Sequence, residues 1–98
     1  MLETFSIETF APLADDAFVV RREAGPPLEL RLVEVESIGA ADATSGRVPF
    51  SIVFRGPAGP ILPQRIHSLE HPRLGAFDLF IVPLQPDAAG SRYQAIFT

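Results

Sequence analysis

Residues 47–83 constrain the fold of this chain more than any other stretch of the sequence. Their apolar residues come in three short runs, and each run is followed by prolines or glycines. The stretch holds six of the ten prolines and four of the eight phenylalanines. Short apolar runs bounded in this way are typical of β-strands, because proline and glycine favour turns and interrupt helices. The stretch therefore predicts three strands joined by turns, within an all-β domain.

The other strands are predicted from the alternation of apolar and polar residues, which marks a half-buried strand. Alternation is clearest at residues 28–36, where every second residue from Leu28 to Leu32 is leucine. The phase then reverses, because Val33 and Val35 become the apolar positions. One extra residue in a strand turns all later side chains to the opposite face, so the reversal predicts a β-bulge or sharp coil. The expected strands are residues 17–23, 28–36, 48–55, 64–70, 76–84 and 92–98.

A short helical turn is expected at residues 5–14, before the first strand. Ser6 can cap it, with Thr9 in the position of a capping box, and Pro12 limits its continuation. Its apolar side chains would cover an open end of the sheet: Phe5, Phe10 and Leu13. Because helical crossovers are missing, residues 1–98 are expected to form one small antiparallel meander of six to seven strands. This meander would curl into a barrel or barrel-like sandwich.

The apolar share of 47% is high for so short a chain and predicts apolar surface in excess of the core. Val53 is expected on an outer face and is one candidate for this surplus. Residues 76–84 are apolar on both faces, which predicts a central strand or one that also meets a partner. Pro83 is expected to end that strand, and residues 85–91 are expected to form a loop.

Charge and composition exclude several classes of function. The net charge is −4, all eight cations are arginine, and Arg21-Arg22 is the one basic pair, so a nucleic-acid partner is not expected. The absence of cysteine excludes disulfides and thiolate chemistry. No apolar run reaches the roughly 18 residues of a membrane helix, and the first residues do not resemble a Sec signal. We therefore expect no membrane partner and a cytoplasmic location, with export by another route left open.

His67, Glu70 and His71 fit the H-x-x-E-H pattern of inverted zinc proteases. That chemistry needs both histidines on one face of a helix, but here the pattern lies in a predicted strand and turn. Residues four apart in a strand are about 13 Å apart, too far to share one metal ion. The simpler interpretation is that Glu70 or His71 hydrogen-bonds turn amides. We therefore expect neither a metal nor another cofactor, and no catalytic residues.

Arg55-Gly56-Pro57 resembles an anion-binding loop, but proline removes the amide donors that such a loop needs. The favoured interpretation is an outward Arg55 that pairs with Glu or Asp. Neither a G-x-S-x-G elbow nor an α/β scaffold supports Ser-His-Asp catalysis.

Several sequence blocks together resemble a family of small bacterial domains of unknown function. The blocks are Arg47-Val-Pro-Phe-Ser-Ile-Val-Phe-Arg-Gly-Pro, Leu62-Pro-Gln, Leu69-Glu-His-Pro-Arg-Leu-Gly, Leu79-Phe-Ile-Val-Pro and Tyr93-Gln-Ala-Ile-Phe. The chain departs from the family pattern at Asp15, Ile66, Gln94 and Thr98. The resemblance implies no catalytic residue, and it implies gene neighbours that resemble phage-tail collar proteins.

The sequence is compatible with two classes of function. The leading hypothesis is a non-catalytic protein-interaction or assembly module, whose partner is a neighbouring gene product or a second copy of the chain. In this hypothesis the module is accessory to a tail-collar-like or appendage protein. The alternative is a small-ligand-binding barrel or modest hydrolase, with His67, Glu70, His71 and Arg55 at the barrel mouth.

Overall fold

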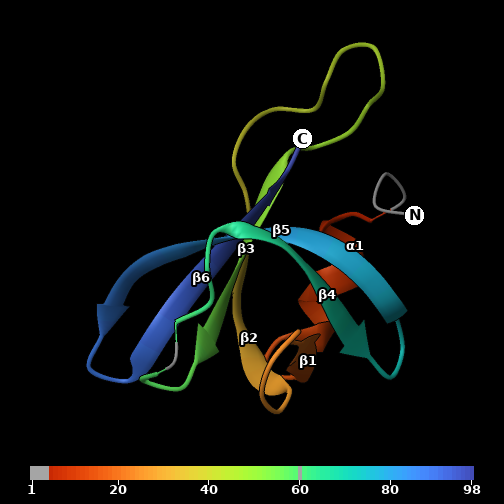
Figure 1. The fold of residues 1–98 in the computed structure, drawn as a ribbon. Coiled ribbons are helices and arrows are strands. Elements are labelled where there is room, and N and C mark those ends of the chain that lie inside the picture. Colours follow the sequence, from red (N-terminus) through yellow and green to blue (C-terminus); the bar gives the residue numbers. More distant parts are fainter. Residues whose placement is uncertain (1–4, 60) are drawn as a thin grey trace.

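The computed structural model describes residues 5–59 and 61–98, and it confirms an all-β barrel with one short N-terminal helix (Figure 1). The helical part is α1 (Ile7–Phe10) followed by the 3-10 turn η2 (Ala11–Leu13). The strands are β1 (Ala17–Arg21), β2 (Leu28–Ser37), β3 (Phe50–Gly56), β4 (Arg65–His71), β5 (Gly75–Asp87) and β6 (Gly90–Phe97). Within the described ranges, no helix has the length and apolar character needed to cross a membrane.

The six strands close in the order β1-β2-β3-β6-β5-β4, and every pair is antiparallel. Strands β1 to β3 form one three-stranded meander and strands β4 to β6 form another. The two meanders are joined by the β3–β6 and β1–β4 pairs, so the chain does not form the single meander that was predicted. The connection from β3 to β4 is rich in proline, which does not suit a tight hairpin. Leu62 in this connection is buried, and its N–H donates to the Tyr93 hydroxyl at 3.0 Å. This bond ties the connection to β6.

The phase reversal in β2 is a β-bulge, as predicted. Leu32 lies opposite Phe54 on β3, but the next partner pair is Glu34 and Val53, so one residue of β2 is extra. Val35 then faces the same side as the leucines before the bulge and packs against the core. A bulge of this kind increases local twist and helps a small sheet to close.

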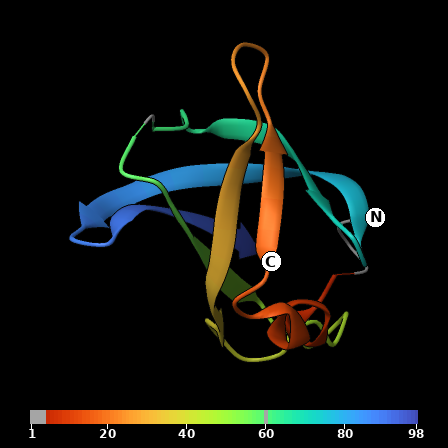
Figure 2. The same cartoon turned by 90° about the horizontal axis from the view of Figure 1, so that it is seen from below.

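The helical segment closes one end of the barrel, also as predicted (Figure 2). The Ser6 N–H donates to the Thr9 hydroxyl at 3.0 Å, the reciprocal bond of a capping box. Phe5, Phe10 and Leu13 are buried in the core cluster. In Figure 2, α1 lies at one end of β1 and the turn of the β1–β2 hairpin lies at the other. The helix therefore covers one end of β1, and the hairpin turn lies at the other end.

The prediction that Pro83 ends its strand is wrong, because β5 runs on to Asp87 and β6 begins at Gly90. The predicted loop at residues 85–91 is therefore reduced to a short hairpin turn. Pairing between β4 and β5 stops at Ile81, so Pro83 has a strand neighbour on the β6 side only. A residue without an N–H is tolerated where a strand is paired on one side.

The expectation that Val53 adds to the exposed apolar surface is wrong, whereas the outer face of β5 keeps an exposed apolar side chain. Val53 is only 5% exposed, because it lies between the longer side chains of Glu34 and Gln94 on the two neighbouring strands. On β5, the inward residues are buried but Phe80 on the outer face is 49% exposed. Strand β3 is thus buried on both faces, and exposed apolar side chains lie instead on the outer faces of β4, β5 and β6.

Candidate functional site

The H-x-x-E-H segment is the strand β4 and not a helix. His67 and His71 alternate with Leu69 on the buried face, and Glu70 lies on the outer face. At strand spacing the two histidines are about 13 Å apart, which excludes one shared ion. Within the described residues, no group of three or more His, Asp or Glu side chains is arranged to hold a metal.

His71 is held by hydrogen bonds at both ring nitrogens. Its Nδ1 accepts the N–H of Arg73 at 3.0 Å, so the ring proton lies on Nε2. Nε2 donates to the Asp16 carboxylate at 2.9 Å, and the ring packs on Phe18 with centroids 4.6 Å apart. The predicted bond from His71 to a turn amide is confirmed. The contact with Asp16 is not predictable, because no local signal in the sequence connects this aspartate to a histidine 55 residues away.

His67 and Glu70 also have partners within the fold. The Nε2–H of His67 donates to the Pro63 carbonyl at 2.8 Å, which anchors the connection before β4. Glu70 accepts two hydrogen bonds from the Arg21 guanidinium, at 2.9 and 3.0 Å, across the β1–β4 pair. The hydrogen bond and charge of Glu70 raise the pKa of Arg21 above its ordinary value. These contacts fasten β4 to its neighbours.

Arg55 points outward and donates to the Asp87 carboxylate, as predicted for a strand-end arginine. Asp87 also accepts the N–H of Ala89 at 3.0 Å, so the same carboxylate holds the β5–β6 hairpin. The hydrogen bond from Arg55 lowers the pKa of Asp87 below its ordinary value, with smaller help from the Ala89 N–H.

Asp87→Asn is expected to lower the melting temperature at pH 7. Because the pKa of Asp87 is lowered in the folded state, its contribution to stability is present above the ordinary value of 3.8 and is lost as pH falls through the folded pKa. The difference between wild type and variant should therefore shrink in acid. Thermal melts from pH 7 down to about pH 2 measure this. Asp78→Asn on the same strand is the control, and an equal deficit at every pH would contradict the expectation.

The Arg55-Gly56-Pro57 block packs closely against Leu30 and Gly90. A Cβ at Gly56 would lie 2.8 Å from Leu30 Cδ2, and one at Gly90 would overlap the Gly56 carbonyl oxygen. The Ser91 hydroxyl donates to the Pro57 carbonyl, so this carbonyl is also occupied. The block therefore joins the end of β3 to the β5–β6 hairpin.

The four residues of the predicted ligand or hydrolase site lie at different places on the barrel. Glu70 and His71 border a hollow beside Val19 and Gly75. His67 borders others, near residues 61–66, and Arg55 is bonded to Asp87 at the β5–β6 hairpin. The geometry brings Glu70 and His71 to one hollow and places His67 and Arg55 elsewhere.

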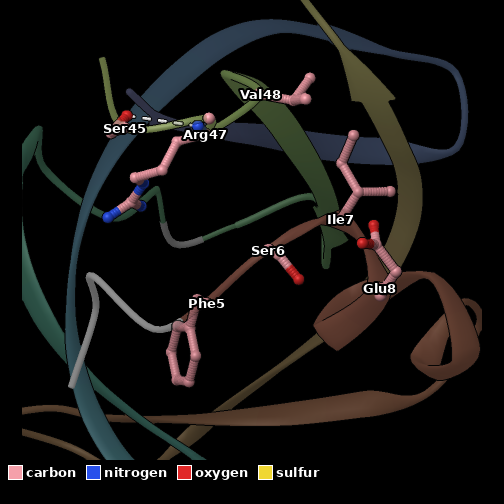
Figure 3. Close-up of a pocket in the computed structure, with 8 residues that line it drawn as sticks. Phe5, Ser6, Ile7, Glu8, Ser45, Arg47 and Val48 are labelled. Carbon is pink, nitrogen blue, oxygen red and sulfur yellow. Dashed lines mark hydrogen bonds between the residues drawn. The ribbon is translucent and has the colours of Figure 1, made fainter. Parts of the chain in front are cut away.

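Figure 3 shows a hollow of about 290 Å³ that the sequence did not indicate. It lies between residues 5–8 and residues 45–48, and its charged side chains are Glu8 and Arg47. Its loop side is shaped by Asp42, which accepts the amides of Thr44 and Ser45 at 3.1 and 2.7 Å. The hydrogen bonds from Ser45, and to a smaller extent that from Thr44, lower the pKa of Asp42 below its ordinary value.

Two further hollows, of about 360 and 260 Å³, lie where the ends of β1 and β4 separate. They share Arg22, Glu23, Arg65 and His67. We call this region the seam and define it by residues 21–23 and 65–68. The seam gathers three of the eight arginines of an acidic chain.

The fold and its contacts define a small closed antiparallel barrel in which the distinctive polar residues secure strands and turns. Within this class, the chain belongs to the family described as domain of unknown function DUF6916, whose model matches residues 5–97. No curated protein and no solved structure matches the chain.

Proposed function

We propose that this barrel is a non-catalytic protein-interaction or assembly module. The observation that carries the proposal is an apolar pair on the outer face: Ile66 on β4 lies directly opposite Phe80 on β5. The two residues are 64% and 49% exposed. Fully burying a side chain of this size contributes about 1.5–3 kcal/mol, so the pair can supply much of the affinity of a contact.

Ile96 on β6 extends this surface. Val82 on β5 pairs with Gln94 on β6. Phe80 lies two residues before Val82 and Ile96 two residues after Gln94, so in antiparallel strands both lie on the same side of that pair. Ile96 therefore shares the outer face and is 57% exposed. We define the outer apolar face as Ile66, Phe80 and Ile96.

The polar contacts support a binding role over catalysis. Both nitrogens of His71 are engaged within the fold, and Glu70 is paired with Arg21. A general base needs a free nitrogen or oxygen within reach of a substrate proton. The first partner to test is the product of a neighbouring gene, an appendage or tail-collar-like protein. A second copy of the chain is the next.

Size-exclusion chromatography with light scattering tests this proposal, on the chain alone and co-expressed with the neighbouring product. The wild type is expected to form a complex or a dimer, and Phe80→Glu to weaken it at least tenfold, about 1.4 kcal/mol. Ile38→Glu is the matched control, because Ile38 is 45% exposed in the loop after β2. A wild type that stays monomeric in both samples would overturn the proposal, as would equal effects of the two variants.

A further inference from the structure

The barrel is paired only briefly where β1 meets β4. The register joins three residue pairs, from Val19 with Glu70 to Arg21 with Ser68. The β3–β6 register, by comparison, joins seven pairs. Strand β4 begins three residues before Ser68, and residues 65–67 pair with β5 on their other side alone. Backbone groups of β4 that face β1 in this stretch therefore lack a strand partner, and an unpaired edge of this kind can accept another strand.

This unpaired edge borders open space. The hollow of about 360 Å³ is lined by residues 21–23 on one side and 65–68 on the other. The hollow of about 260 Å³ shares four of its lining residues and extends to residues 61–63. Figure 2 shows the nearby β1–β2 hairpin turn projecting away from the barrel, at the opposite end of β1 from α1. An extended peptide can therefore reach the edge along the seam.

The charge of the seam is opposite to that of the chain. Arg21, Arg22 and Arg65 face a single lining carboxylate, Glu23, in a chain of net charge −4. Arg21 is paired with Glu70, and one nitrogen of Arg22 donates to the Pro26 carbonyl at 3.2 Å. The exposed side chain of Arg65 makes no hydrogen bond or ion pair within residues 5–59 and 61–98. Guanidinium groups bind carboxylates through two parallel hydrogen bonds.

The two faces of β4 differ at this edge. Arg65 lies on the same face as His67, and Ile66 lies on the opposite, outer face with 64% of its surface exposed. Residues opposite one another on adjacent strands share a face. A strand added here would place one set of side chains beside Arg65 and the alternate set beside Ile66.

We propose that the seam binds an extended segment of a partner protein in which acidic and apolar side chains alternate, added as a strand to the edge of β4. The acidic residues pair with Arg65 and Arg22, and the apolar residues cover Ile66. The proposal rests on the proposed function as a protein-binding module and specifies the chemistry of the partner. It follows the strand-addition mode of peptide recognition, in which main-chain bonds give affinity and alternate side chains give specificity.

The probe is a capped six-residue peptide of alternating valine and glutamate, titrated into the isotope-labelled protein and followed by amide chemical shifts. Shifts are expected at residues 21–23 and 65–68, with slower hydrogen exchange at residues 65–67. A valine–lysine peptide is expected to produce neither. Arg65→Glu should weaken binding of the acidic peptide at least tenfold and favour the lysine peptide. Arg73→Glu, the same charge change in the β4–β5 turn, should leave both affinities unchanged.

The inference is overturned if millimolar acidic peptide shifts no seam amide, or if Arg65→Glu and Arg73→Glu weaken binding equally. The co-expressed complex separates its failure from failure of the proposed function. A complex lost in Phe80→Glu but retained in Arg65→Glu would overturn binding at the seam and support the proposed interaction module. A complex lost in Arg65→Glu but not in Arg73→Glu supports the seam. Retention in Phe80→Glu and Arg65→Glu alike would overturn both.

Discussion

Phe10→Ala is expected to lower the free energy of unfolding by about 3–5 kcal/mol, the range measured for phenylalanine removed from a core. The Phe10 side chain is fully buried. Its ring lies 5.3 Å from that of Phe5, 6.4 Å from Phe18, 6.1 Å from Phe50 and 5.4 Å from Phe97. Loss of this ring leaves a cavity in the middle of the aromatic cluster at the closed end of the barrel.

The loss should lie at the upper end of this range because Phe10 also holds the helix in place. Helix α1 has only four residues, and a helix so short is not stable by itself in water. It is kept in place by its buried side chains, so the variant should release α1 and expose the stacked rings of Phe50 and Phe97, 4.5 Å apart. A chain of this size gains only about 5–15 kcal/mol from folding, so the variant will be marginal.

Urea unfolding followed by circular dichroism measures the change, with Phe80→Ala as the matched control. Phe80 is half exposed on the outer face, so its replacement should change stability by no more than about 0.5 kcal/mol. Similar losses in the two variants would show that Phe10 does not hold the closed end of the barrel.

The core and the strands could be predicted because they depend on local pattern. Alternation from Leu28 to Leu32 placed three side chains inside, and the reversal at Val33 placed the bulge. Each of these inferences needs only a few neighbouring residues, because side chains in a strand alternate between faces. The capping pair Ser6 and Thr9 is equally local.

The polar contacts between β1 and β4 and between Asp16 and His71 could not be predicted, because they depend on how the barrel closes. Asp16 and His71 are 55 residues apart, and Arg21 and Glu70 are 49 apart. Each pair meets only after β1 pairs with β4 in one register, and a shift of one residue would turn every side chain to the other face. The seam has the same origin, since it exists because β4 extends past the last residue pair with β1.

Gly90→Ala is expected to cost about 3 kcal/mol from backbone strain alone, the upper end of the range for a sparsely populated conformation. Gly90 has a φ of 137°, which residues with a Cβ rarely adopt. The new Cβ would also overlap the Gly56 carbonyl oxygen, a backbone atom that no rotamer change can move. The β5–β6 hairpin would have to withdraw from the end of β3.

Two control glycines separate strain from contact. Gly75 has a φ of 75°, but a Cβ added there would meet no atom within 4 Å, so Gly75→Ala carries strain without a clash. Gly59 has neither feature, so Gly59→Ala should be neutral or stabilising by up to about 1 kcal/mol through the unfolded chain. Unfolding free energies, measured by urea titration, should fall in the order Gly59→Ala, Gly75→Ala, Gly90→Ala. If Gly90→Ala costs no more than Gly75→Ala, the close approach of the hairpin to β3 contributes nothing to stability.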